Sequence, residues 1–191
     1  MASKRLGLCV VGLGRAGSIH LAALAKLGDE IETVAVVDAI AERAEDLARR
    51  YGVAKRYASL KAALADPAVE AVDICLPHDL HCDTVVRAAE AGRHVIVEKP
   101  MANTVAEADA MIAAAEKAGV TLMVGQSRRF FPAAMESQRL VASGAIGRLI
   151  HVHAGYFGLM EKPQNDWWHL ASRTGGLMLA LWGSHILDYM L

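Results

Sequence analysis

Cysteine, proline and aromatic residues are scarce in this chain of 191 residues, which has three cysteines, five prolines and 5% aromatic residues. An odd number of cysteines without Cys-x-x-Cys spacing argues against both a disulfide framework and a zinc site. This cysteine content is typical of a reducing compartment, so we expect a cytoplasmic protein. An excess of charge is missing as well, because 20 Lys and Arg are balanced by 21 Asp and Glu. Nucleic acid and anionic membrane surfaces are therefore not expected as partners.

Long hydrophobic runs are also missing. The most apolar stretch, residues 175–191, is shorter than the roughly 18 residues that a membrane span requires, and it contains His185 and Asp188. The first five residues include no apolar stretch ending in a cleavage site, so we expect no signal peptide. The sequence has instead 54% hydrophobic and 21% charged residues, which is enough apolar material for a large core.

Short apolar runs alternate with helical patterns over the first two-thirds of the chain, as in a parallel sheet covered by helices. This alternation predicts an α/β fold with a Rossmann-type, doubly wound parallel sheet. Ser59 is expected to cap a short helix, and Thr104 with Glu107 forms a capping box for a longer one. The expected strands are residues 6–11, 31–37, 71–76, 94–97 and 121–124, and the longer helices are residues 16–27, 40–51, 79–91 and 104–118.

The pattern changes after Gly125. We therefore expect a nucleotide-binding Rossmann domain in residues 1–125 and an incomplete substrate-binding α/β domain, the start of an open sheet, in residues 126–191. In this second part Pro132 is expected to open a helix reaching Val141. Residues 148–157 alternate like a strand with one solvated face, and the polar residues 161–173 are expected to form a loop.

A glycine motif, Gly12-Leu13-Gly14-Arg15-Ala16-Gly17, lies between the first expected strand and the first expected helix. Gly12 permits a tight turn, Gly14 lets a pyrophosphate approach the backbone, and Gly17 lets the helix pack close to the strand. The helix N-terminus then offers free N–H groups to the phosphates. These six residues are therefore candidate cofactor-binding residues, although ordinary turn glycines remain the alternative.

Asp38 follows the second expected strand, 21 residues after Gly17. A carboxylate at this place accepts hydrogen bonds from a ribose hydroxyl and repels a 2′-phosphate, so NAD is favoured over NADP. Arg43 lies close enough in sequence to keep NADP as the alternative. Leu76 and Pro77 end the 71–76 strand and are expected to border the same crevice.

Glu98 and Lys99 follow the strand at residues 94–97, where an open parallel sheet places its reactive groups. Adjacent side chains of a strand point to opposite faces, so the two are expected to diverge. A buried lysine has a lowered pKa, which makes Lys99 a candidate base for removing a hydroxyl proton, with a solvated strand end as the alternative. His185 and Asp188 share a helix face, where the histidine could relay that proton and the aspartate could fix its tautomer; a buried, satisfied histidine is the alternative.

Two further sets of residues carry weaker signals. Trp168, next to Trp167, is a candidate substrate-pocket residue, although large aromatic side chains more often belong to a core. His151 and His153 share one face of an expected strand, but no nearby Cys, Asp or Glu completes a ligand set, so we expect no metal.

Taken in order, the motifs of this chain resemble those of the glucose–fructose oxidoreductase / inositol dehydrogenase / rhizopine-catabolism family (Gfo/Idh/MocA). The resemblance spans nearly all 191 residues. It rests on the glycine motif and Asp38 followed by Pro77-His78-Asp79-Leu80-His81, Ala91-Gly92-Arg93-His94-Val95-Ile96-Val97-Glu98-Lys99-Pro100, Arg129-Phe130-Phe131-Pro132, Gly144-Ala145-Ile146-Gly147, and Gly175-Gly176 through His185 and Asp188.

The resemblance implies an oxidoreductase that moves hydride between NAD(P) and a hydroxyl or carbonyl of a sugar, polyol or related small molecule. It implies that Lys99 and His185 are catalytic and touch the substrate, and that Glu98 and His81 border the cofactor. It also places Gln126 and Arg129 near the nicotinamide and the substrate. With a complete second domain, a homo-oligomer is expected.

Two departures from the family pattern matter. Leu181 stands where many members carry an aspartate four residues before the histidine, so a proton relay through that position is lost. The sequence also reaches only Leu191, and the family's second domain is expected to be truncated here. The alternative to an active dehydrogenase is therefore a catalytically incompetent nucleotide-binding fragment or a module of a larger assembly. A ligand-free Rossmann-like scaffold is the third and least supported hypothesis.

Overall fold

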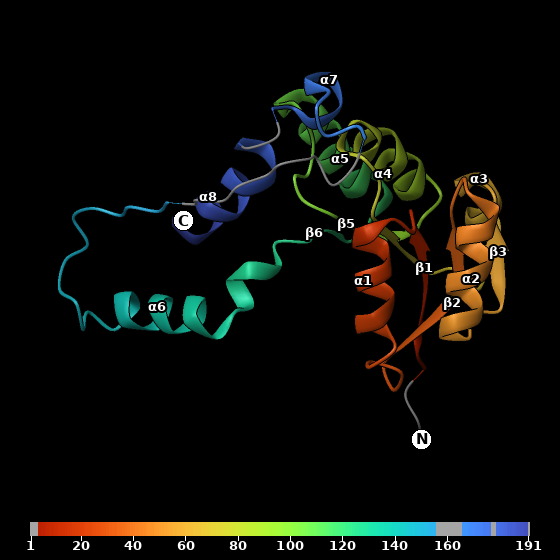
Figure 1. Ribbon diagram of the computed structural model, residues 1–191, viewed down its shortest axis with the longest axis horizontal. Coiled ribbons are helices and arrows are strands. Elements are labelled where there is room, and N and C mark those ends of the chain that lie inside the picture. Colours follow the sequence, from red (N-terminus) through yellow and green to blue (C-terminus); the bar gives the residue numbers. More distant parts are fainter. Residues whose placement is uncertain (1–3, 156–165, 177–178, 191) are drawn as a thin grey trace.

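The computed structural model describes residues 4–155, 166–176 and 179–190. Six parallel strands form one sheet in the order β3-β2-β1-β4-β5-β6 (Figure 1). The chain runs outward from β1 in one direction to β2 and β3 and in the other to β4, β5 and β6. This reversal is the topological switch point of a doubly wound fold, and a crevice opens there at the carboxyl ends of the strands. The strands are β1 (Leu6–Val11), β2 (Ile31–Val37), β3 (Lys55–Tyr57), β4 (Ala71–Ile74), β5 (His94–Val97) and β6 (Leu122–Val124).

Helices cover both faces of this sheet, because its strands are apolar on both sides. On one face, β1 and β2 pack against α1 (Arg15–Leu24) and α2 (Ala41–Tyr51). On the other face they pack, together with β4 and β5, against α3 (Leu60–Leu64), α4 (His81–Glu90) and α5 (Val105–Ala118). Buried residues alternate between the two clusters along β1, with Val10 in the first and Val11 in the second. The expected doubly wound α/β fold is confirmed.

Three of the expected helix ends are built as the sequence indicates. The Ser59 side chain accepts a hydrogen bond from Ala62 N at 3.3 Å and caps α3. Thr104 and Glu107 form the reciprocal capping box of α5, at 3.2 Å and 3.0 Å. Gly119 ends α5 in the left-handed conformation that glycine adopts without strain.

Several expected boundaries are wrong in detail. Helix α1 ends at Leu24, three residues before the expected end, and β4 ends at Ile74. The edge strand β3 was not expected, because three residues with two polar side chains carry no buried-strand pattern. Each difference concerns an element end or an edge strand, where local sequence carries the weakest signal.

Beyond β6 the chain leaves the sheet as an arm, which carries η2 (Ser127–Phe130) and α6 (Pro132–Ala142) and extends away from it (Figure 1). The strand expected at residues 148–157 is not formed in its described part, residues 148–155, which are irregular and exposed. Alternation alone does not make a strand, because its backbone needs a ladder partner. Residues 156 and 157 lie outside the described residues.

The described C-terminal residues return to the Rossmann domain. They form α7 (Ala171–Thr174), the π-helix η3 (Leu179–Gly183) and α8 (Ser184–Met190). Helix α7 begins within the segment 161–173 that was expected to be a loop and ends one residue beyond it. Residues 161–165 of that segment lie outside the described residues. Among the described residues, no helix combines the length and apolar character that crossing a membrane requires.

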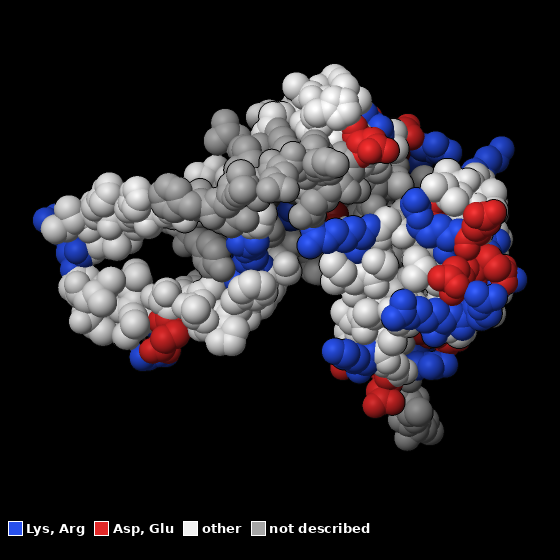
Figure 2. Space-filling model, in the orientation of Figure 1, with Lys and Arg blue, Asp and Glu red and all other residues white. Residues whose placement is uncertain are grey.

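Charge is distributed unevenly over the visible face of the molecule. Figure 2 shows basic and acidic side chains interspersed over the Rossmann domain, whereas the arm is mostly uncharged. Several large apolar side chains of the arm are exposed: Phe130, Phe131, Met135, Ile146 and Ile150. On this face side chains of both signs are mixed, as the nearly equal numbers of basic and acidic residues lead one to expect.

Candidate active site

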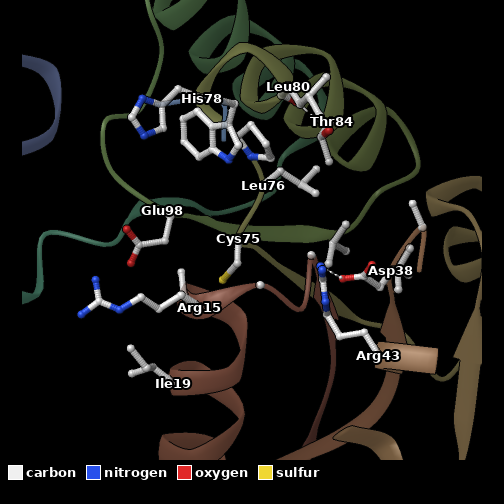
Figure 3. A pocket seen from close by; sticks show the side chains of 18 of the residues that line it. Arg15, Ile19, Asp38, Arg43, Cys75, Leu76, His78, Leu80, Thr84 and Glu98 are labelled. Carbon is white, nitrogen blue, oxygen red and sulfur yellow. Dashed lines mark hydrogen bonds and ion pairs between the residues drawn. The ribbon is translucent and has the colours of Figure 1, made fainter. Parts of the chain in front are cut away.

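One large cavity, of about 1200 Å³, lies at the carboxyl ends of β1, β2, β4 and β5. Asp38 and Arg43 lie at one end, called here the nucleotide end, and Glu98 and Arg15 lie toward the other (Figure 3). The second end, called here the catalytic end, is completed by residues from the loop after β5 and from the C-terminal segments. The predicted site residues that line the cavity are Gly12, Gly14, Arg15, Ala16, Asp38, Leu76, Pro77, Glu98, Lys99, Trp168 and His185.

The glycine turn between β1 and α1 shows a different reason for each glycine. Gly12 has φ of +88°, and a Cβ there would lie 2.6 Å from the Cys75 carbonyl oxygen. A Cβ on Gly17 would overlap the carbonyl oxygen of Gly12, so α1 packs against the turn only with glycine here. A Cβ on Gly14 would meet nothing within 4 Å. Packing thus requires Gly12 and Gly17, whereas Gly14 leaves backbone exposed to the cavity.

This turn fits the pyrophosphate of a dinucleotide. Helix α1 begins at Arg15 directly after Gly14, and no side chain caps its first N–H groups. Such N–H groups and the helix dipole bind phosphate oxygens. The open surface at Gly14 lies where the phosphates would approach, so the residues present match an NAD-type cofactor.

Asp38 is held rigidly at the end of β2. It is 8% exposed, and one carboxylate oxygen accepts hydrogen bonds from the Leu13 N–H at 2.7 Å and from Arg43 at 3.2 Å. The other oxygen accepts from the Ile40 N–H at 2.8 Å. Asp38 and Arg43 therefore form an ion pair (Figure 3). In the sequence, Asp38 favoured NAD and Arg43 kept NADP as the alternative.

Lys99 lines the catalytic end from the loop after β5. Burial lowers its pKa below the ordinary value, and the charges of Arg128 and Arg15 lower it further, while Glu98 opposes them. The structure therefore provides the environment that a lysine base requires.

Glu98 is bonded on both carboxylate oxygens. One oxygen lies 3.1 Å from Nε2 of His20 in α1, and the other accepts the Lys99 N–H at 3.1 Å. Burial raises the pKa of Glu98, but the hydrogen bond from His20 and the charges of Lys99 and His20 outweigh it, so the pKa lies below its ordinary value. Glu98 is therefore a carboxylate at neutral pH.

His185 reaches the catalytic end from α8 and is 6% exposed. Its pKa is lowered to about 4, first by burial and then by the charges of Lys99 and Arg128. Its Nδ1 is buried without a hydrogen-bond partner among the described residues. A neutral imidazole with an unused ring nitrogen can hydrogen-bond a substrate hydroxyl.

The expected pairing of His185 with Asp188 is wrong. Both oxygens of Asp188 accept hydrogen bonds from Arg129 of η2. The family resemblance implied instead that Arg129 lies near the nicotinamide and the substrate. Arg129 is exposed, whereas its neighbour Arg128 lines the cavity. Successive residues of a 3-10 helix point about a third of a turn apart, so the motif alone did not show which arginine faces inward.

The other predicted cofactor residues are not among those that line the cavity. Leu13 is buried in the core and Gly17 packs inside the turn. Gln126 immediately precedes η2. His81 is fully buried, with its ring nitrogens 2.9 Å from the carbonyl oxygens of Leu76 and Pro100, so it joins the loops after β4 and β5.

A short segment, residues 166–176, closes the cavity beside Trp168. His78 Nδ1 lies 3.3 Å from the Thr174 carbonyl oxygen, and Arg173 pairs with Asp79 at 3.0 Å. The ring of Trp167 stands edge-on to His78 at 5.1 Å. These contacts join the segment, called here the closing segment, to the loop after β4.

The fold and cavity together define a nucleotide-binding Rossmann protein with a candidate catalytic lysine. The comparisons with known proteins give its family, because the model of an oxidoreductase family with an NAD-binding Rossmann fold, Gfo/Idh/MocA, matches residues 6–126. The chain belongs to this family.

Relatives and solved structures agree with this assignment. The chain is 36% identical to scyllo-inositol 2-dehydrogenase (NAD(+)) of Bacillus subtilis over 142 residues, which are 74% of this chain and 42% of that protein. It is 31% identical to levoglucosan dehydrogenase of Pseudarthrobacter phenanthrenivorans, covering 98% of this chain and 50% of that one. The crystal structure of an oxidoreductase domain protein from Kribbella flavida superposes with a TM-score of 0.90 at 32% identity, over 98% of this chain and 53% of that chain. The chain thus spans about half the length of these relatives.

Proposed function

We propose that this chain belongs to an NAD-dependent dehydrogenase that oxidises a CH–OH group of a sugar, a polyol or a related small molecule. The observation that carries the proposal is the single cavity that joins the glycine turn and Asp38 to Lys99 and His185. The names of the inositol and levoglucosan dehydrogenases support this substrate class. The three free cysteines support the expected reducing compartment, the cytoplasm.

Within this proposal the two parts of the chain have different roles. Residues 1–125 form the nucleotide-binding domain, because the sheet ends with β6 at Val124. Residues 126–191 belong to a substrate domain and contribute Trp168 and His185 to the cavity.

The chemistry follows from the two titratable groups at the catalytic end. A bound NAD supplies the hydride acceptor. Lys99, whose lowered pKa increases the fraction of neutral amine, takes the proton from the substrate hydroxyl. His185 is neutral at pH 7 and hydrogen-bonds the same hydroxyl, which orients it toward the amine. Trp168 limits the space beside them.

Replacing the lysine tests this assignment. We expect Lys99→Met to lower kcat for polyol oxidation by about 10²- to 10⁴-fold, the usual contribution of a general base, while NADH binding persists. Lys117→Met, at an exposed position of α5, is the matched control and keeps wild-type turnover. Unchanged turnover in Lys99→Met would remove the lysine from the mechanism.

The second candidate function is a nucleotide-binding module without turnover of its own. It is favoured by Leu181, which stands at the position where many members of the family carry an aspartate. This candidate predicts tight NADH binding with no oxidation of any polyol. Recovery of turnover after adding a C-terminal piece from a relative would identify a fragment, and its continued absence would identify a binding module.

A further inference from the structure

His20 is a partly buried titratable residue that neither the glycine motif nor the catalytic end includes. It lies on α1, three residues after Gly17, and its side chain is 23% exposed. Its Nδ1 lies 2.8 Å from an oxygen of Asp73 in β4, and its Nε2 lies 3.1 Å from an oxygen of Glu98. One imidazole thus connects the cofactor-binding helix with the loop that carries Lys99.

The hydrogen-bond geometry indicates the charge on His20. A neutral imidazole carries one N–H, so it can donate to only one of two carboxylates. The other ring nitrogen would then direct a lone pair at a carboxylate oxygen. An imidazolium donates to both, and its positive charge offsets the burial of Asp73, which is 2% exposed.

The surrounding groups favour the same state. Hydrogen bonds to Asp73, Cys75 and Glu98, in that order, raise the pKa of His20 to about 12, although burial acts in the opposite direction. Burial raises the pKa of the neighbouring Cys75 thiol to about 12, so this group adds no negative charge near pH 7. Among the described residues, the charged groups bonded to the ring are therefore the two carboxylates of Asp73 and Glu98.

We propose that His20 is a permanently charged positioning residue, which ties Glu98, the first residue of the loop after β5, to helix α1. It thereby sets the placement and the electrostatic environment of Lys99, the next residue of that loop. The contacts continue from His20 to Lys99 without a gap, because the second oxygen of Glu98 accepts the Lys99 N–H at 3.1 Å. The role in catalysis rests on the proposed function. The charged bridge itself does not.

A metal site made of the same residues is the competing hypothesis. Ligand atoms of His20, Asp73 and Cys75 lie within 4.8 Å of one another. A metal requires a deprotonated ring nitrogen, whereas the bridge keeps protons on both nitrogens, so the two states exclude each other. Added zinc is therefore expected to leave the ring unchanged, and coordinated ring nitrogens at stoichiometric zinc would overturn the bridge.

The first experiment measures the charge on His20 in the wild-type chain, without substrate or cofactor. Nitrogen-15 NMR of the histidine rings, assigned by the signal lost in His20→Gln, is followed from about pH 5 to pH 9, across the ordinary histidine pKa of about 6.5. The bridge predicts that both ring nitrogens of His20 stay protonated throughout. A titration of His20 near the ordinary value would overturn the proposal, whether or not any variant folds.

The second experiment measures what the bridge does to Lys99. The pH dependence of Lys99 acetylation by acetic anhydride, read by mass spectrometry, gives the pKa of its amine in each variant. In His20→Gln the uncompensated charge of Glu98 is expected to raise the pKa of Lys99. In Glu98→Gln, where the negative neighbour is lost, the pKa is expected to fall.

Opposite shifts distinguish an electrostatic bridge from simple loosening, which would move both variants toward the ordinary lysine value. His94→Gln is the matched control, because His94 lies exposed on β5 and bonds the Thr121 N–H instead. An unchanged Lys99 pKa in a folded His20→Gln protein would overturn the positioning role.

Turnover then separates this inference from the proposed function. If the wild type oxidises a polyol, His20→Gln is expected to lower kcat by about 10-fold or more with little change in KM, as misplacement of a reacting group does. A fall confined to KM would contradict positioning. If no polyol is oxidised while both shifts are found, the dehydrogenase proposal fails and the charged bridge stands.

Discussion

At the scale of single residues, the ion pair of Asp38 and Arg43 is expected to decide which nicotinamide dinucleotide binds. The Asp38 carboxylate faces the nucleotide end of the cavity and is fixed by two backbone N–H groups. A 2′-phosphate placed there meets a fixed negative charge, whereas a ribose hydroxyl meets an acceptor. Arg43 is paired with this carboxylate through one guanidinium nitrogen, so the negative charge of Asp38 offsets its attraction for a 2′-phosphate.

Removing the charge of Asp38 is therefore expected to shift cofactor preference. In Asp38→Asn the amide oxygen still accepts one backbone hydrogen bond, but repulsion of the 2′-phosphate is lost and Arg43 is released. We expect the ratio of NADPH to NADH affinity to rise at least about 10-fold, equivalent to about 1.4 kcal/mol. Fluorescence titration measures this ratio, and Asp46→Asn, an exposed change in α2, is the matched control. An unaltered ratio would show that Asp38 does not select the cofactor.

Lys99 and His185 predict a pH dependence of turnover. The pKa of Lys99 lies below its ordinary value and that of His185 is lowered to about 4. Polyol oxidation needs the neutral amine, so kcat/KM is expected to rise with pH and level off below the ordinary lysine pKa of about 10.4. The titration of His185 does not change kcat/KM between about pH 5 and pH 9, because this histidine is already neutral there. If kcat/KM of Lys99→Met still rises with pH in the same range, the rise comes from a group other than Lys99.

Residue identities were easier to predict than residue contacts. The glycine motif, Asp38 and Lys99 were found in the sequence because each follows a strand end, and such ends meet at one edge of a parallel sheet. His20 was missed, since its partners Asp73 and Glu98 lie 53 and 78 residues away. The inward-facing arginine, Arg128 rather than Arg129, depended on the rotation of one short helix.

At the scale of elements, two glycines of one turn make opposite predictions for the same substitution. Gly17→Ala places a Cβ against the Gly12 carbonyl oxygen and forces α1 away from the turn. Such overpacking costs about 1–3 kcal/mol, so its Tm should fall. Gly14→Ala meets nothing within 4 Å and should keep the wild-type Tm, while its methyl group lowers NADH affinity. Thermal unfolding and NADH titration of both variants check this, and equal Tm losses would contradict the assigned roles.

The closing segment is expected to loosen in acid. Burial lowers the pKa of His78 to about 4, from an ordinary value of about 6.5 in the unfolded chain. The stabilisation from its neutral form is complete above about 6.5 and is lost as pH falls through about 4. Protonation opposes the burial of His78 beside Trp167, so tryptophan fluorescence should change between about pH 6.5 and pH 4.

His78→Asn tests the origin of that change. The variant carries no imidazole, so the acid-linked fluorescence change should disappear, while His94→Asn, an exposed change on β5, should retain it. An identical transition in all three proteins would show that the closing segment responds to another group.

At the scale of the whole molecule, the sequence pattern predicted the sheet better than the C-terminal third. Strands β1 and β4 are buried at every residue except Leu6, and Asp73 is the one charged residue among them, so their sequence pattern is strong and local. Residues 148–155 show the alternation of apolar and polar side chains that is typical of a strand, yet their backbone is irregular. A strand depends on a hydrogen-bonded neighbouring strand as well as on its own sequence. The covered sheet forms a cavity for a dinucleotide even though the chain spans about half of its relatives' length.

The central claim, an NAD-dependent catalytic cavity, is tested most directly by titrating the purified 191-residue chain with NADH and then NADPH, following nucleotide fluorescence. The glycine turn and Asp38 predict micromolar NADH affinity and much weaker NADPH binding. Preference for NADPH would contradict the role of Asp38 and assign the nucleotide end to Arg43. Binding of neither nucleotide by the folded chain would contradict the account as a whole.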